Sequence, residues 1–295
     1  MTELLESILR GLGTGSAYAL LALGFVIIYK ATGVVSFAQP AMLLCGAVLI
    51  SYLSPVLGFY LALVVGGLAI AGLGLGVERA FIRPMVGRPV FVVAIITIGI
   101  DIAVRVVANG FIGIGARPIG DPWGLSRFTV AGLSMQWRHV AMIVTAALVL
   151  SVLFWFYRFT RHGLAMRATA FDQEAAMTQG VSVGSVFAMS WAMAAGLAAV
   201  AGALLATGAG VDQQLWIITL VALPAIILGG LDSLEGAVVG GLAVGVVESL
   251  VGSYRGEFAP WLGNNFESVS PYLLMLLVLL VRPYGMWGTP EVRRV

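Results

Sequence analysis

Long apolar runs separated by short polar segments make up most of this chain. A continuous run of about 20 apolar residues is long enough to cross a bilayer as a helix. Because the apolar residues are continuous and do not alternate with polar ones, a transmembrane β-barrel is disfavoured. The pattern predicts an all-α polytopic membrane protein with eight to ten transmembrane helices, forming one membrane domain over residues 1–295. The expected spans are roughly 8–29, 37–53, 60–81, 90–109, 138–157, 184–207, 214–231, 236–253 and 270–281.

Two of these spans are irregular. Gln39 and Pro40 interrupt the second run, so the segment after Ser36 is expected to be either a broken or a re-entrant helix. The last run is short unless it begins within the preceding loop. The first run has neither the basic start nor the cleavage site of a signal peptide, so it is expected to be a retained span.

Composition agrees with the membrane assignment. The chain is 60% hydrophobic and 10% charged, whereas soluble domains are about a quarter charged. The single cysteine, Cys45, lies in an apolar run, so no disulfide within the chain is possible. The loop 110–137 is too short for a separate domain and is expected to be compact and ordered.

The cations predict an orientation. Cytoplasmic loops of membrane proteins carry the excess of Lys and Arg. Ten cations fall on one side, which is therefore expected to be cytoplasmic, with the C-terminus inside and the N-terminus outside a bacterial plasma membrane. These are Lys30, Arg79, Arg83, Arg88, Arg158, Arg161, Arg167, Arg282, Arg293 and Arg294. The opposite side holds Arg10, Arg117, Arg127, Arg138 and Arg255.

A polar, helix-competent segment, residues 158–183, separates two apolar runs. Glu174, Ala175 and Ala176 precede Gly180 at the spacing of a short helix ended by a glycine. A small Ala-Ala face beside an acid suits insertion into a groove of a partner protein. An amphipathic helix lying on membrane lipid explains the same residues equally well, and the residues alone leave both interpretations open.

The sequence contains no catalytic or metal-ligating constellation. His139 and His162 fall at loop–membrane boundaries and are interpreted as interfacial surface residues. A phosphate-binding GxxxxGK[ST] loop is absent, so ATP is not expected to bind this chain. Glycine pairs such as Gly236–Gly240 and Gly241–Gly245 are interpreted as close helix packing.

Six motifs, taken together and in order, resemble the branched-chain amino acid ABC transporter permeases of the LivH type. The E-A-A-x3-G segment of 174–180 resembles the coupling helix of ABC importer permeases. The other five are the segment 33–39, the E-R-x3-R-P turn of 78–84, the G-x-A-M-R-A-x-A segment of 163–170, the L-G-G-x2-S-x2-G turn of 228–236 and the R-P-x-G-x2-G ending of 282–288.

The resemblance implies an ABC importer permease fold with a cytoplasmic coupling helix. It also implies a transporter subunit that is not itself an enzyme and carries no cofactor. The implied partners are a second homologous permease chain of the LivM type, two subunits of the LivG and LivF type that bind ATP-Mg, and an extracytoplasmic solute-binding protein, with no nucleic acid. The implied ATPase-coupling residues are Arg167, Glu174, Ala175, Ala176 and Gly180.

The resemblance also implies a substrate pathway, expected at Ser36, Phe37, Gln39, Thr97, Gly99 and Asp101. The family sequence usually continues with Gly-Glu where this chain has Pro40-Ala41, so an acidic residue is missing from the segment. The expected substrate is therefore a branched-chain amino acid or an amide, urea or carboxylate relative, moved into the cytoplasm.

Buried ionisable residues leave a second function open. Asp101 and Arg105 lie four apart on one helix face, so they can pair with each other or face the pathway or the partner chain. Glu248 lies where Arg255 could reach it. The alternative function is an ion-coupled secondary transporter or a channel acting without ATPases, with Asp101 and Glu248 as ion sites.

Overall fold

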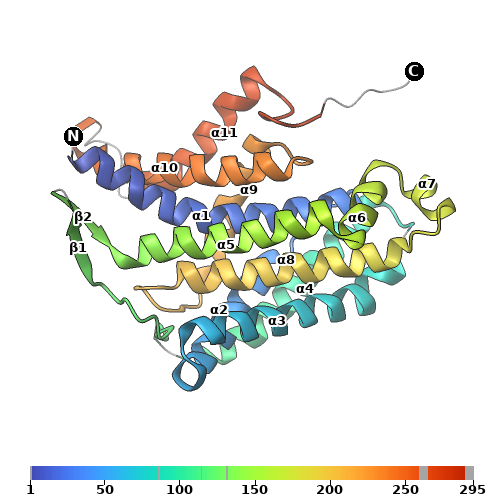
Figure 1. The fold of residues 1–295 in the computed structure, drawn as a ribbon, viewed down its shortest axis with the longest axis horizontal. Coiled ribbons are helices and arrows are strands. Elements are labelled where there is room, and N and C mark those ends of the chain that lie inside the picture. Colours follow the sequence, from blue (N-terminus) through green and yellow to red (C-terminus); the bar gives the residue numbers. More distant parts are fainter. Residues whose placement is uncertain (1, 86, 114, 131, 259–264, 290–295) are drawn as a thin grey trace.

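The computed structural model describes residues 2–85, 87–113, 115–130, 132–258 and 265–289 (Figure 1). Its helices are α1 (Thr2–Thr32), α2 (Gln39–Leu57), α3 (Phe59–Val77), α4 (Val90–Gly110), α5 (Trp137–Phe159), α6 (Arg161–Phe171), α7 (Gln173–Thr178), α8 (Val183–Leu205), α9 (Ile218–Gly229), α10 (Leu234–Phe258) and α11 (Ser270–Val281). Short helical turns cover Glu78–Ile82, Arg83–Met85, Leu215–Ile217 and Phe266–Ser268.

The predicted spans are confirmed to within a few residues at most ends. Seven helices in the described part of the chain are long and apolar enough to cross a membrane. Two shorter apolar segments, Leu215–Gly229 and Phe266–Val281, match the remaining two runs. The last run does begin in the preceding loop, because the turn Phe266–Ser268 leads into α11. The chain is a multi-pass helical membrane protein.

The long helices form a bundle with two distinct ends (Figure 1). The start of α1 and a β-hairpin lie at one end, here called the hairpin end. Helices α6 and α7 lie at the opposite end, here called the α7 end. The hairpin consists of β1 (Arg127–Val130) and β2 (Leu133–Gln136), paired antiparallel.

The hairpin is the one regular element that the sequence pattern does not predict. Each strand has four residues, which is too few to establish an alternating pattern. The expected order of the loop 110–137 is confirmed by its anchors. Ser54 donates a 2.5 Å hydrogen bond to the carbonyl of Ile119, and Arg117 and Val211 exchange backbone hydrogen bonds of 2.8 and 2.7 Å.

Helix α1 is the centre of the bundle, with 89% of its most apolar 18-residue window buried. It packs against α10 through facing glycines on the two helices. A Cβ on Gly245 would lie 2.3 Å from the Cα of Gly15, and a Cβ on Gly241 would lie 2.4 Å from the backbone nitrogen of Ala19. Such distances require backbones in direct contact, so the interpretation of the glycines as close packing sites is confirmed.

The chain between α1 and α2 turns back into the bundle. The N–H of Phe37 bonds to Thr97, which lies seven residues, or about 10 Å, into α4. The side chain of Gln39 lies beside Gly24, eight residues before the end of α1. Residues 33–38 are therefore re-entrant. Pro40 does not break α2, because it lies in the first helical turn, where its missing N–H leaves no hydrogen bond unmade.

The cations divide between the ends as the sequence grouping predicts. At the α7 end, Lys30 donates to the carbonyl of Asp232 at 2.8 Å and Arg83 donates to that of Gly184 at 3.0 Å. At the hairpin end, Arg10, Arg127 and Arg138 line one pocket. Arg293 and Arg294 lie outside the described residues. Which end faces the cytoplasm stays a prediction.

Candidate functional site

Local hydrogen bonds at both ends shape the segment of α6 and α7. The side chain of Asp172 accepts from the N–H of Ala175 at 3.0 Å and so caps the start of α7. Gly180 has a positive φ of 80°, and its N–H donates to the carbonyl of Met177 at 3.0 Å. The N–H of Val181 donates to Ala176 at 3.0 Å, completing a Schellman cap. The predicted short helix with a glycine stop is confirmed.

The surface of α7 carries apolar side chains that nothing in the described chain covers. Phe171, directly before α7, is 96% exposed, and Met177 is 54% exposed. Glu174 and Ala175 are also exposed, whereas Ala176 is buried beneath the helix. Exposed apolar groups at a polar end of a protein mark contact surfaces. Phe171 is a functional candidate that the sequence analysis missed, although a lone aromatic residue before a capping residue could have indicated it.

Hydrogen bonds fasten α7 to α1 and fasten the end of α3 to the start of α8. Gln173 donates from its amide to the carbonyl of Ala31 at the end of α1, at 3.0 Å. Glu78 is fully buried and binds Arg83 through two 3.2 Å hydrogen bonds. Arg83 also donates to Gly184 at the start of α8. The E-R-x3-R-P motif thus fastens the end of α3 to the helix that follows α7.

Arg167, expected among the coupling residues, is half-buried on α6. Its guanidinium lies 5.9 Å from the ring centre of Tyr157 on α5. It lines a pocket with Lys30 and Asp232 and is therefore turned toward the bundle. Phe171 and Gln173 line the same pocket, so Arg167 packs close to the exposed end of the segment.

The two glycine-rich motifs near the C-terminus pack on each other at the α7 end. The N–H of Met286 donates to the carbonyl of Leu228 at 2.9 Å, and that of Trp287 donates to Gly229 at 3.1 Å. A Cβ on Gly230 would lie 2.5 Å from the backbone nitrogen of Gly288. The glycines of these two motifs therefore have a structural explanation, because the two backbones lie too close together to leave room for a side chain.

The residues expected in the pathway gather where the re-entrant segment meets α4. Ser36 is buried and accepts from the N–H of Ala38 at 3.3 Å. The N–H of Phe37 donates to Thr97 at 3.0 Å, and Thr97 is itself fully buried. Asp101 lies one turn further along α4. Gly99 does not join them, since it is exposed on another face of α4.

Gln39 is the least satisfied polar side chain of this cluster. It is 2% exposed, and neither its amide nitrogen nor its amide oxygen has a hydrogen-bond partner among the described residues. A buried polar atom without a partner costs about 1–3 kcal/mol. The amide therefore has an unused NH₂ donor group and an unused carbonyl acceptor in the interior of the bundle.

Asp101 and Arg105 form an ion pair with each other, which is one of the arrangements that the sequence left open. Their closest atoms, Oδ2 and a guanidinium nitrogen, are 2.7 Å apart. The guanidinium also stacks on Trp216 at 3.8 Å from the ring centre, which links α4 to the turn before α9. The second carboxylate oxygen, Oδ1, is buried without a hydrogen-bond partner. The pair is neutral as a unit, and the backbone N–H of Ala41 also lies close to its carboxylate.

Two expectations about isolated residues are wrong. Arg255 does not reach Glu248 but binds Glu267 at 3.0 Å, and Glu248 instead accepts from the hydroxyl of Tyr18 at 2.8 Å. His139 is 5% exposed and packs on Gly13, so it is not an interfacial surface residue.

The assignment of His162 as a surface residue is confirmed. His162 is exposed and stacks on Phe156, with the ring centres 6.4 Å apart. Within the described residues, no group of three His, Cys, Asp or Glu is placed to hold a metal ion.

The bundle, its re-entrant segment and its exposed α6–α7 segment define a class of protein: a membrane permease with the ABC importer permease fold. A solved structure titled "PsaBC from Streptococcus pneumoniae in complex with Fab" has a similar fold, with a TM-score of 0.52 over 94% of this chain and 92% of that chain, at 14% identity. At that identity the likeness concerns the fold alone.

The family follows from the sequence comparison. Residues 7–279 match the family described as "Branched-chain amino acid transport system / permease component", and the chain belongs to it. It is 29% identical to the high-affinity branched-chain amino acid transport system permease protein LivH of Salmonella typhimurium, over 99% of this chain and 97% of that one. It is also 29% identical to BraD of Pseudomonas aeruginosa, over 99% and 98%. A probable LivH of Methanocaldococcus jannaschii is 31% identical over 91% and 88%.

Proposed function

We propose that this permease moves a branched-chain amino acid, or a small neutral relative such as an amide, into the cytoplasm of a bacterium. In this proposal the α7 end faces the cytoplasm and the hairpin end faces outward. The grouping of Lys30, Arg79, Arg83, Arg158 and Arg161 at the α7 end supports this orientation by the positive-inside rule.

The observation that carries the proposal is the exposed surface of Phe171 and Met177 beside a tightly capped α7. A helix lying on lipid would turn its apolar side chains toward the bilayer. Here α7 projects beyond the helices of the bundle at one end (Figure 1), and Phe171, the last residue of α6, is 96% exposed. We infer that this surface inserts into a groove of a separate ATP-binding subunit.

The remaining partners follow from the same proposal. Two ATP-binding subunits of the LivG and LivF type would hold ATP-Mg, a second permease of the LivM type would complete the pathway, and a solute-binding protein would deliver the solute at the hairpin end. Closure of the ATP-binding subunits would shift α7, and Gln173 and Arg83 would pass that shift to α1 and α8. The pathway would then alternate between two states.

The chemistry of the pathway cluster supports a solute without net charge. The amide of Gln39 offers an NH₂ donor group and a carbonyl acceptor, and the Asp101–Arg105 pair contributes no net charge. A zwitterionic amino acid or a neutral amide matches such a surface, whereas a simple carboxylate would lack a free cation to balance it. The names of the relatives favour the amino acid.

Uptake by the reconstituted complex tests the proposal. With all subunits in proteoliposomes, uptake of labelled leucine is expected to require ATP and to survive a protonophore. Phe171→Ser is expected to reduce uptake at least tenfold, while Leu125→Ser, at another exposed apolar site near the hairpin, leaves it unchanged. Uptake without ATP that a protonophore abolishes would instead identify an ion-coupled transporter.

A further inference from the structure

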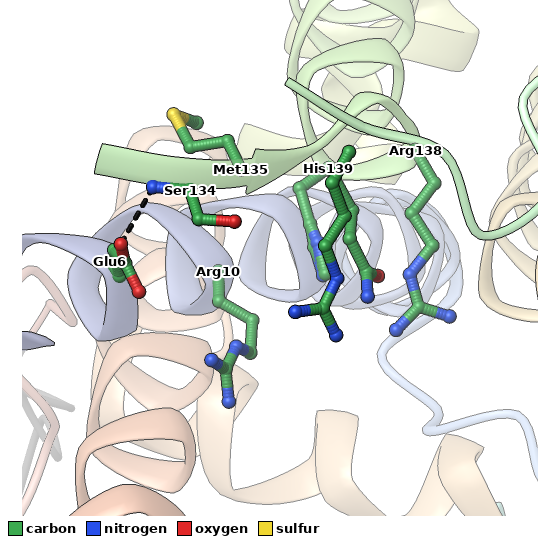
Figure 2. Close-up of a pocket in the computed structure, with 8 residues that line it drawn as sticks. Glu6, Arg10, Ser134, Met135, Arg138 and His139 are labelled. Atoms are coloured by element: carbon green, nitrogen blue, oxygen red, sulfur yellow. Dashed lines mark hydrogen bonds between the residues drawn. The ribbon is translucent and has the colours of Figure 1, made fainter. Parts of the chain in front are cut away.

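A cationic pocket at the hairpin end is not used by the proposed transport mechanism. It lies between the first turns of α1, the strand β2 and the start of α5, and has a volume of about 220 Å³. Figure 2 shows that the side chains of Arg10 and Arg138 extend to the same side of α1, although they come from different helices. Arg127 lines the pocket with them.

The pocket concentrates positive charge that the chain itself does not neutralise. Among the described residues, none of Arg10, Arg127 and Arg138 forms an ion pair. The only carboxylate lining the pocket belongs to Glu6, and one of its oxygens accepts from the N–H of Ser134 at 2.6 Å. Arg138 lies close enough to Arg10 and Arg127 to feel their like charges. Three guanidinium groups and one carboxylate give the lining two net positive charges, and the carboxylate of Asp121, which also acts on Arg138, offsets part of this charge.

Buried polar atoms inside the pocket also lack partners. His139 is 5% exposed, yet its Nε2 has no hydrogen-bond partner in the described part of the chain. The Nε of Arg138 is buried and unpartnered as well, although the same side chain donates from another nitrogen to the carbonyl of Thr207 at 3.2 Å. Native proteins rarely leave such groups unsatisfied, so these atoms are available to hydrogen-bond an ion or water in the pocket.

The start of α5 also favours an anion in this pocket. Helix α5 has 23 residues and begins at Trp137, so Arg138 and His139 occupy its first turn. Gln136, at the N-cap, does not cap the helix with its side chain, and its buried Oε1 has no partner. A rotation of that amide would present its NH₂ to the pocket. Free N–H groups and the helix dipole favour an anion at this position.

We propose that this pocket binds a phosphoryl group. Guanidinium groups pair with phosphate oxygens through parallel hydrogen bonds, and phosphate carries about −1.5 to −2 charges at neutral pH, opposite in sign to the net positive lining of the pocket. The volume holds one such group with a few water molecules, since water takes about 30 Å³. The source is either inorganic phosphate or the headgroup of a phospholipid, because the first turns of α1 and α5 lie where these helices leave the apolar core.

Thermal unfolding of the full chain, purified with its partner subunits, tests the proposal. In delipidated detergent solution, millimolar inorganic phosphate is expected to raise the unfolding midpoint by about 2–4 °C over chloride at equal ionic strength. Arg138→Gln is expected to abolish the shift, and Arg79→Gln, which removes an exposed cation at the other end, to keep it. Glu6→Gln is expected to increase the apparent affinity for phosphate, because it removes the competing carboxylate while an amide oxygen can still accept from Ser134.

Two further arms identify the source. Native mass spectrometry of the complex taken from phosphatidylglycerol nanodiscs should detect a retained lipid in the wild type and in Arg79→Gln but not in Arg138→Gln, if a headgroup is the ligand. Phosphate stabilisation without a retained lipid identifies the free ion. The proposal is overturned if neither lipid nor phosphate binds, if acetate stabilises as well as phosphate, or if Glu6→Gln leaves phosphate affinity unchanged.

Discussion

The α6–α7 segment and the re-entrant segment 33–39 are both polar interruptions of an apolar chain, but their polar groups find partners in opposite ways. In α6–α7, the caps by Thr160, Asp172 and Gly180 satisfy the backbone from within a few residues, and most of α7 is exposed. In 33–39, Phe37 bonds to Thr97, sixty residues away, and Gln39 finds no partner. The α6–α7 surface is therefore built largely from local contacts, whereas the site at the re-entrant segment exists only in the assembled bundle.

The comparison predicts that changes around the re-entrant segment affect stability most, beginning with Asp101. Asp101→Asn leaves Arg105 without its counter-ion inside the bundle, and loss of one partner of a buried pair costs about 3 kcal/mol or more. The double variant Asp101→Asn/Arg105→Gln should recover most of the loss, since no uncompensated charge remains. Unfolding in mixed detergent–SDS micelles measures the stability of both variants. Equal stability of the single and double variants would contradict the ion pair between Asp101 and Arg105.

A matched pair of threonine substitutions compares the two regions directly. Thr97→Val leaves the N–H of Phe37 buried without an acceptor and is expected to cost about 1–2 kcal/mol. Thr178→Val, in α7, removes a hydroxyl that donates to the carbonyl of Ala175 at the surface, and is expected to change stability by less than about 0.5 kcal/mol. An equal loss in the free energy of unfolding for Thr97→Val and Thr178→Val would contradict the difference between the two regions.

Gln39→Leu is expected to separate stability from function. Because both polar atoms of the amide are unpartnered, leucine should leave the free energy of unfolding unchanged or raise it by about 1 kcal/mol. Uptake should fall at least tenfold if the amide contacts the solute. Unfolding and uptake are measured on the same preparation, and a loss of stability in step with uptake would assign Gln39 a structural role.

A local effect, confined to the end of α7, is expected at Gly180. Its φ of 80° disfavours a side chain by about 1 kcal/mol, so Gly180→Ala should loosen the end of α7 with little effect on global unfolding. Gly76→Ala, a helical glycine with open space around it, is the control. Amide hydrogen exchange should increase at Gln179–Val181 in Gly180→Ala alone; exchange that stays unchanged would contradict the cap.

Much of the architecture was predictable, because it depends on local pattern. The apolar runs gave the spans, and the order Glu174-Ala175-Ala176 before Gly180 gave α7, since capping and glycine stops act over a few residues. The pairing of Asp101 with Arg105 was foreseen as a possibility from their spacing of four. The hairpin, the exposure of Phe171 and the true partners of Glu248 and Arg255 were not.

These failures share a physical cause. Tyr18 and Glu248 are 230 residues apart, and only the contact of α1 with α10 brings them together. The re-entrant path of 33–38 likewise depends on α4 supplying Thr97 as an acceptor. Of the six residues expected in the pathway, five gather in one place, and Gly99 does not, because spacing along α4 turns it to another face.

Contact between α7 and an ATP-binding subunit is the central claim, and site-specific photo-crosslinking tests it most directly. Benzoylphenylalanine in place of Phe171, in the assembled complex, is expected to form a covalent product with an ATP-binding subunit. The same probe in place of Leu125, at the hairpin end, is expected to form none. Crosslinking of residue 171 to lipid alone, or to the solute-binding protein, would contradict the account.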